Sequence, residues 1–127
     1  MLVDDDPDDN FIHERLIKKN AAADIVIIKR TAIEALRYLK SKKENSGLLL
    51  PDLIFLDINM PGMNGWEFLD EYKELAKEFH SHTLVVMLTT SENPDDMLRA
   101  KLLAKVAAFK SKPLTKEMLE EILEKHF

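Results

Sequence analysis

Residues 51–65 read PDLIFLDINMPGMNG, a short apolar run that ends at a single carboxylate, Asp57. The proline before the run and the Pro-Gly and Asn-Gly pairs after it predict a short strand over residues 53–56. A continuous apolar run of this length is typical of a strand buried on both faces, as in a parallel sheet. Asp57 would then lie at the carboxyl end of the strand, where open α/β sheets bind their ligands. Alternatively, Asp57 is a turn residue whose side chain bonds its own backbone.

The composition predicts one globular domain over residues 1–127, because 46% of the residues are hydrophobic and 32% are charged. The formal net charge of −5 disfavours sequence-independent binding to nucleic acids, which needs basic patches. The absence of cysteine excludes disulfides and thiolate zinc sites. No apolar run approaches the about 18 to 20 residues of a membrane span, and no signal peptide is apparent. We therefore expect a soluble, cytoplasmic protein without membrane partners.

The rest of the chain alternates short apolar runs with longer amphipathic segments. Strands are predicted over residues 1–3, 25–28, 53–56, 83–89 and 107–111. Helices are predicted over residues 7–20, 32–39, 66–79 and 94–105 and from about residue 115 onward. Residues 40–47 look like a polar turn. Five strands alternating with five helices predict an α/β fold with a parallel sheet, helices on both faces and right-handed crossovers.

Two of these helices have clear sequence signals. Asp6 is the expected N-cap of the first helix, with Pro7 at its first position and Asp9 as an acid favoured by the helix dipole. The apolar stripe of that helix would consist of Phe11, Ile12, Leu16 and Ile17. The helix over residues 66–79 would bury Leu69, Tyr72, Leu75, Ala76 and Phe79 on one face.

Polar residues follow the predicted strands at the points where the strands end. They are Asp4, Asp5, Asp57, Thr89 and Lys112. Each has an ordinary structural explanation as a cap, a turn former or a solvated lysine. Because parallel strands finish at one edge of the sheet, we expect all of them to converge there. Clustered carboxylates repel unless a cation offsets their charge, and oxygen ligands suit Mg²⁺.

These residue types also suit one reaction. A carboxylate can act as a nucleophile and form an aspartyl-phosphate. Phosphoryl transfer is catalysed mainly by positioning and by neutralising the phosphoryl oxygens, which Mg²⁺ and Lys112 could do together. The Thr89 hydroxyl could hydrogen-bond one phosphoryl oxygen.

Four motifs occur in an order and spacing that resemble the receiver domain of two-component response regulators. They are Val3-Asp4-Asp5, Leu56-Asp57-Ile58-Asn59-Met60-Pro61 with Asn64-Gly65, Leu88-Thr89 and Lys112-Pro113. The resemblance covers essentially the whole chain. It implies a CheY-like, flavodoxin-like doubly wound sheet of five parallel strands in the order 2-1-3-4-5, with five helices.

The resemblance also implies roles for the site residues. Asp57 would be the phosphoacceptor for a histidine kinase phosphohistidine. Asp5 would bind Mg²⁺ directly and Asp4 through water, although Asp6 remains an alternative to either. The backbone carbonyl of Asn59 would complete the Mg²⁺ site together with Asp57.

Three more residues take roles from the same resemblance. Lys112 would pair with the phosphoryl group, and its bond to Pro113 would be cis, which is uncommon without a structural cause. Thr89 and Phe109 would form the switch pair, in which the hydroxyl moves to the phosphate and the ring turns inward. Phe109 could also be an ordinary half-buried aromatic residue of a strand, and that position is compatible with the switch role.

As a family member, the protein would be a phosphoacceptor signalling domain that catalyses only its own phosphorylation and dephosphorylation. Its partners would be a sensor histidine kinase or phosphotransfer protein and a downstream protein target. A second copy of the chain is a further possible partner, in a homodimer that forms on phosphorylation. The readout surface would comprise the helix from Asn93, the fifth strand and the last helix. No output domain fits within 127 residues, so the domain acts alone or belongs to a longer regulator.

Three other functions compete with this interpretation. An aspartyl-phosphate hydrolase of the haloacid dehalogenase kind would need a second aspartate where Asn59 stands. A flavodoxin-like FMN carrier would need a Ser/Thr/Gly-rich phosphate loop after the first strand, where this chain has five aspartates. A receiver-shaped scaffold would bind partners without being phosphorylated.

Overall fold

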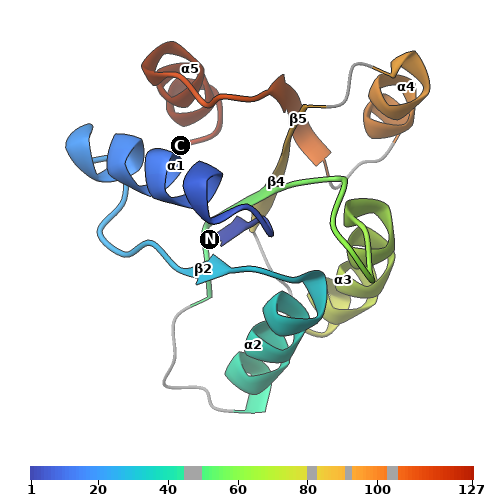
Figure 1. The fold of residues 1–127 in the computed structure, drawn as a ribbon. Coiled ribbons are helices and arrows are strands. Elements are labelled where there is room, and N and C mark those ends of the chain that lie inside the picture. Colours follow the sequence, from blue (N-terminus) through green and yellow to red (C-terminus); the bar gives the residue numbers. More distant parts are fainter. Residues whose placement is uncertain (45–49, 80–82, 91–92, 103–105) are drawn as a thin grey trace.

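The computed structural model describes residues 1–44, 50–79, 83–90, 93–102 and 106–127. A five-stranded parallel sheet forms the centre of the molecule, in the order β2-β1-β3-β4-β5 (Figure 1). The strands are β1 (Leu2–Val3), β2 (Ile28–Lys29), β3 (Leu53–Leu56), β4 (Leu84–Thr89) and β5 (Val106–Ser111). The predicted fold class and strand order are confirmed.

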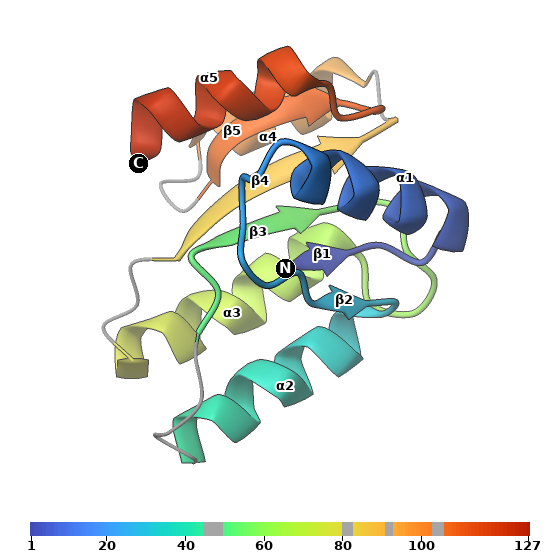
Figure 2. The ribbon, with the colours of Figure 1, turned by 90° about the vertical axis from the view of Figure 1, so that its left-hand side faces the viewer.

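Helices cover both faces of the sheet, as expected for a doubly wound fold. They are α1 (Pro7–Lys19), α2 (Ala32–Glu44), α3 (Gly65–Phe79), α4 (Pro94–Leu102) and α5 (Lys116–His126). Figure 2 shows α1 and α5 on one face of the sheet and α2 and α3 on the other. Ala100 of α4 packs into the same cluster as α2 and α3. In the described part of the chain no helix has the length and apolar character needed to cross a membrane.

Each face of the sheet has its own hydrophobic cluster, and the central strands contribute to both. Ile54 and Leu56 pack under α2 and α3, whereas Phe55 packs between the sheet and α1 and α5. On β4, Val85 and Met87 face one cluster and Val86 and Leu88 the other. This alternation confirms that the apolar run of β3 is a strand buried on both faces.

Among the described residues, two predicted boundaries are wrong by more than one residue, the start of β2 and the end of α2. β2 begins at Ile28, and Ile25, predicted to start that strand, is 62% exposed. β1 offers a partner only at Leu2 and Val3, so the ladder of β2 extends over Ile28 and Lys29 alone. α2 continues through Glu44 across the first part of the predicted turn. Lysine and glutamate are good helix formers, and no glycine or proline interrupts them there; residues 45–47 lie outside the described residues.

The predicted apolar stripe of α1 is also wrong in its first half. Phe11 is 64% exposed and Ile12 53% exposed, whereas the buried residues of this helix are Asn10, His13 and Ile17. By contrast, α3 buries Leu69, Tyr72, Leu75 and Ala76 as predicted. The side chain of Phe79 and the predicted end of α4 near residue 105 lie outside the described part of the structure.

Candidate functional site

The register of the central strands brings two aspartates together. In the parallel ladder, Val3 of β1 pairs with Leu56 of β3, so the residues that follow them, Asp4 and Asp57, emerge side by side. The backbone N–H of Asp57 donates to the carbonyl of Val3 at 3.0 Å. Both aspartates are buried, at 5% and 7% exposure. Two buried carboxylates at one sheet edge need a compensating charge.

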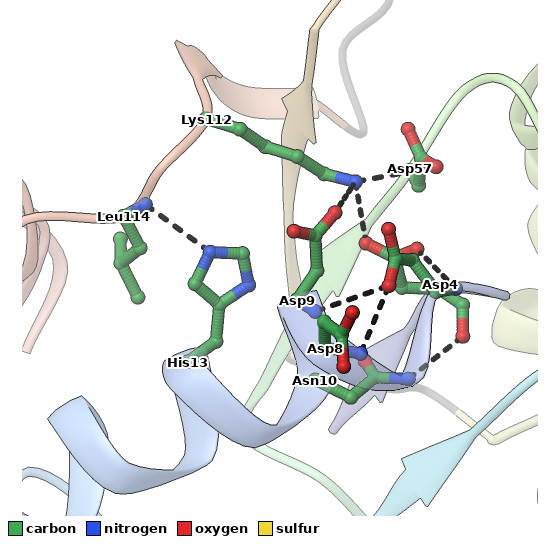
Figure 3. Close-up of polar contacts among 9 residues, drawn as sticks. Asp4, Asp8, Asp9, Asn10, His13, Asp57, Lys112 and Leu114 are labelled. Atoms are coloured by element: carbon green, nitrogen blue, oxygen red, sulfur yellow. Dashed lines mark hydrogen bonds and ion pairs between the residues drawn. The ribbon is translucent and has the colours of Figure 1, made fainter.

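Lys112 supplies a positive charge from the end of β5. Its Nζ lies 2.6 Å from Asp4 Oδ2, 2.8 Å from Asp9 Oδ2 and 3.4 Å from Asp57 Oδ2 (Figure 3). The backbone N–H of Lys112 donates to the carbonyl of Thr89 at 2.9 Å, which fixes the start of the side chain. The Lys112–Pro113 peptide bond is cis, as predicted.

The electrostatics of the site follow from burial and from these contacts. Burial alone would lower the pKa of Lys112, but hydrogen bonds to Asp4 and Asp9 and the charge of Asp57 raise it above its ordinary value. Burial raises the pKa of Asp57, and the charge of Asp4 adds to the increase. The charge of Lys112 and a hydrogen bond from the Thr89 side chain act in the opposite direction. The positive charge of Lys112 and the hydrogen bond from Thr89 therefore only partly offset the effect of burial, and the pKa of Asp57 stays above its ordinary value.

A metal ion would fit the same edge. Asp4, Asp5 and Asp57 each offer one carboxylate oxygen, and these oxygens lie within 4.8 Å of one another. Such an all-oxygen set suits a hard divalent cation such as Mg²⁺. Asn59 lies in the loop two residues beyond Asp57 and is exposed.

Asp6 has a different task from its two neighbours. Its Oδ1 accepts hydrogen bonds from the backbone N–H groups of Asp8 at 2.9 Å and Asp9 at 3.3 Å. This confirms Asp6 as the N-cap of α1. Its carboxylate is therefore engaged with the helix, whereas the carboxylates of Asp4 and Asp5 converge with that of Asp57.

The Asn64-Gly65 motif holds α3 against the loop that follows Asp57. A Cβ atom on Gly65 would lie 2.5 Å from the carbonyl oxygen of Asp57, so this close approach requires glycine. Asn64 and Glu67 cap each other reciprocally, with side chain to backbone distances of 2.9 and 3.1 Å. α3 therefore begins at a fixed position behind the site.

One face of α1 contributes polar residues to the site. Asn10 Nδ2 donates to the carbonyl of Asp4 at 2.9 Å, and His13 Nε2 accepts from the backbone N–H of Leu114 at 3.3 Å (Figure 3). His13 is 2% exposed, and burial lowers its pKa. Sequence reasoning missed Asn10 and His13 and assigned Asp9 only to the helix dipole. No local signal could have found them, because their partners belong to the residues that follow β1 and β5.

The two proposed switch residues lie on neighbouring strands. Thr89 is fully buried at the end of β4, and its side chain forms a hydrogen bond with the side chain of Asp57. Phe109 of β5 is half-buried, is in register with Met87 and packs against the cluster under α2 and α3. Phe109 is thus a partly buried strand aromatic.

Trp66 connects the start of α3 to α4. It is 5% exposed, its Nε1 donates to Asp96 Oδ1 at 3.2 Å, and the Arg99 guanidinium lies 4.7 Å from the centre of its ring. Trp66 follows Gly65, which contacts the Asp57 backbone. Its fluorescence can therefore report on movement between the Asp57 loop and α4.

A hollow lies at the end of the central strands opposite to the candidate site. It has a volume of about 710 Å³ and is lined mainly by apolar residues, among them Met1, Ile17, Leu53 and Leu123. These residues belong to the amino-terminal ends of β1 and β3 and to the helices beside them. Asp4, Asp57 and Lys112 lie at the carboxyl ends of the strands, so the hollow is separate from the candidate site.

Comparison with known proteins agrees with the geometry. The family model described as the response regulator receiver domain matches residues 1–124. Response regulator Rcp1 of Synechocystis is 33% identical over 98 residues, which make up 77% of this chain and 65% of Rcp1. The chain therefore spans slightly less than two thirds of that relative. A solved structure of Rcp1 in its Mn²⁺-bound form matches 97% of this chain and 87% of its own with a TM-score of 0.71 and 29% identity.

Two further solved structures resemble the chain over nearly its full length. A two-component response regulator from Cytophaga hutchinsonii has a TM-score of 0.89 and 30% identity, with 98% of this chain and 92% of that chain covered. The receiver domain of the histidine kinase CKI1 from Arabidopsis thaliana, complexed with Mg²⁺ and BeF₃⁻, has a TM-score of 0.80 and 26% identity. That match covers 97% of this chain and 85% of the other.

Proposed function

Because the chain belongs to the response regulator receiver domain family, we propose that its Asp57 accepts a phosphoryl group from a histidine kinase or phosphotransfer protein. The observation that supports this most directly is the convergence of three carboxylates within 4.8 Å, with the Lys112 ammonium 3.4 Å from Asp57 Oδ2. A nucleophilic carboxylate, a place for a divalent cation and a fixed positive charge are what phosphoryl transfer to an aspartate needs.

In the proposed reaction, a carboxylate oxygen of Asp57 attacks the phosphorus of a phosphohistidine. The P–O bond forms as the P–N bond breaks, and the imidazole leaves with the electron pair. Asp4, Asp5, Asp57 and the backbone carbonyl of Asn59 would hold Mg²⁺, which when bound supplies charge neutralisation for the carboxylates and phosphoryl oxygens. Lys112 would bind a phosphoryl oxygen, and burial at the sheet edge would limit the access of water.

The switch would act through contacts that differ between the two states. Phosphorylation adds about 1.5 to 2 negative charges at the sheet edge. It can shift the conformation only through contacts that favour one state. We assign these contacts to Thr89, whose side chain would turn from Asp57 to the phosphoryl group, and to the partly buried Phe109, whose ring would move inward.

The surface formed by α4, β5 and α5 would then bind a downstream protein or a second copy of the domain. α4 presents three exposed apolar residues there, with 44%, 57% and 77% exposure: Met97, Leu98 and Leu102. Exposed apolar side chains gathered on one helix are typical of a protein-binding surface. The helix is linked to the site through Trp66 and Asp96.

Intact mass spectrometry after incubation with acetyl phosphate, with and without Mg²⁺, tests the phosphoacceptor assignment. We expect wild type to gain the mass of one phosphoryl group only with Mg²⁺, and Asp57→Asn to gain none. The adduct should be labile to base. If wild type gains no mass and Trp66 fluorescence does not respond to beryllofluoride and Mg²⁺, the proposed function is wrong. The receiver-shaped scaffold then becomes the better explanation.

A further inference from the structure

We propose that Asp9 restrains the phosphorylation of Asp57 by holding the Lys112 ammonium, and that this ion pair must open when the phosphoryl group arrives. The inference rests on the proposed function and adds a residue outside the strand ends to it. Asp9 Oδ2 lies 2.8 Å from Lys112 Nζ, whereas Asp57 Oδ2 lies 3.4 Å from the same atom. Lys112 therefore sits closer to Asp9 than to the carboxylate whose phosphoryl group it would bind (Figure 3).

The hydrogen-bonding capacity of Lys112 is fully used. An ammonium has three N–H donors, and three carboxylate oxygens surround this one. A phosphoryl group on Asp57 would bring strong acceptor oxygens and about 1.5 to 2 additional negative charges. For Lys112 to bind one of those oxygens, one of its present partners must give up a bond.

Asp4 and Asp9 differ as competitors for Lys112. Asp4 belongs to the carboxylate group that could hold a metal ion, so a bound cation would offset its charge. Among the residues that the structure describes, the carboxylates close enough to share a metal ion are those of Asp4, Asp5 and Asp57, and Asp9 is not one of them. Asp9 would therefore keep its attraction for Lys112 after the metal has bound, which makes it the competitor that phosphorylation has to overcome.

The position of Asp9 is fixed by the helix around it. The Asp9 backbone N–H is capped by Asp6, and the next residue, Asn10, is bonded to the carbonyl of Asp4. One turn later, His13 accepts from the backbone N–H of Leu114, two residues after Lys112. α1 is thus tied to both strand ends that flank Asp9. The ion pair would open by movement of the flexible lysine side chain while α1 stays in place.

Removing the Asp9 charge should raise two measured quantities, the phosphorylation rate at saturating Mg²⁺ and the Mg²⁺ concentration needed for half-maximal rate. It weakens the hydrogen bond between Lys112 and residue 9, because an amide oxygen attracts an ammonium less than a carboxylate does, and it removes a negative charge close to the incoming phosphoryl group. Phosphorylation at saturating Mg²⁺ should therefore become faster by about 2- to 10-fold. It also removes a negative charge near the cation, so the Mg²⁺ concentration for half-maximal rate should rise. Damage to the fold would slow the reaction and would not produce this combination.

The test compares Asp9→Asn with Asp8→Asn. Asp8 has the same charge in the same first turn of α1, but its side chain is exposed, so this control accounts for the lost charge and the helix dipole. The rate of phosphoryl mass gain from acetyl phosphate is measured over a series of Mg²⁺ concentrations. A third variant, Asp9→Glu, keeps the charge with a side chain long enough to reach Lys112.

We expect the rate at saturating Mg²⁺ to increase in Asp9→Asn and to stay within about 2-fold of wild type in Asp8→Asn and Asp9→Glu. Urea unfolding of each variant checks that it is folded at the assay temperature. A rate for folded Asp9→Asn that is equal to or below that of Asp8→Asn would overturn the proposal. A wild type that gains no phosphoryl mass and shows no Trp66 fluorescence response to beryllofluoride and Mg²⁺ would instead overturn the proposed function, so the two failures are distinguishable.

Discussion

α1 and α3 pack against opposite faces of the same sheet, yet they bury different kinds of side chain (Figure 2). α3 buries an apolar face made of Trp66, Phe68, Leu69, Tyr72, Leu75 and Ala76. α1 buries Asn10, His13 and Ile17 and leaves Phe11 and Ile12 exposed. The two helices therefore follow the usual hydrophobic pattern to very different degrees.

The difference follows from what each helix contacts. α3 packs on the interior of the sheet, where its neighbours are apolar residues of β3 and β4. The first half of α1 lies beside the strand ends, where it meets the carbonyl of Asp4, the Lys112 ammonium and the N–H of Leu114. Buried polar groups need partners, so this part of α1 has to be polar on its inner side. Hydrophobic periodicity identifies the buried face of a helix only where that face meets an apolar core.

The largest expected effect is at the centre of α3. Phe68 is fully buried and stacks on Tyr72, with ring centroids 5.8 Å apart and ring planes at 4°. Phe68→Ala should lower the free energy of unfolding by about 3 to 5 kcal/mol, because it removes a large apolar side chain and leaves a cavity. Urea denaturation followed by circular dichroism measures it. A loss below about 1 kcal/mol would contradict the assignment of this face to a packed core.

The same contrast explains what the sequence could predict. The convergence of Asp4, Asp57 and Lys112 was predictable, because each follows an apolar run and parallel strands end at one edge. The apolar face of α3 was predictable from its spacing. The α1 stripe was not, because Phe11 and Ile12 have the spacing of a core face, and nothing local indicates that the helix faces a polar site. The extent of β2 depends on where β1 offers a partner, which is tertiary information.

The predicted site was incomplete for a related reason. Asp9 satisfies the rule for acids in the first turn of a helix, so its ion pair with Lys112, 103 residues away in the sequence, had no local signal. His13 was one of four histidines without a metal-binding pattern, and its role depends on the backbone of Leu114. Residues that act through contacts with groups far away in the sequence need the fold to be known first.

A smaller effect is expected at His13, where a polar partner is removed while the volume is kept. His13→Leu leaves the buried N–H of Leu114 without its acceptor, which costs about 1 to 3 kcal/mol of stability. Urea denaturation at pH 7.5 measures the change. If His13→Leu is as stable as wild type or more stable, the inner face of α1 does not need this polar group, and the contrast with α3 weakens.

The pH dependence of stability sharpens the same point. Burial lowers the pKa of His13; Lys112 lowers it further, while Asp9 and Asp4 partly oppose the shift. Below the ordinary histidine value of about 6.5, the unfolded state therefore binds more protons than the folded state at this position. Stability should fall as the pH drops from about 7 toward the folded-state pKa, by at most about 1.4 kcal/mol per pH unit from this residue.

His13→Leu is the control for that pH effect. In this variant the stability should change less between pH 7 and pH 5.5 than in wild type, because one of the groups that takes up a proton on unfolding is gone. The other titrating groups are common to both proteins and cancel in the difference. Equal slopes for the two proteins would show that His13 is not buried in its neutral form.

The smallest expected effect uses the same substitution as the largest, but on α1. Phe11→Ala removes a side chain that is 64% exposed, so the free energy of unfolding should change by no more than about 0.5 kcal/mol. Phe68→Ala and Phe11→Ala make the same chemical change in two helices, so the difference between their effects on stability reports the difference in burial directly. A loss of more than about 1 kcal/mol at Phe11 would mean that a surface covers this side of α1 in solution. Phe11 and Ile12 would then belong to an interface with another molecule. The apolar spacing of α1 would have predicted their burial correctly, but they would be buried against that molecule and not against the sheet.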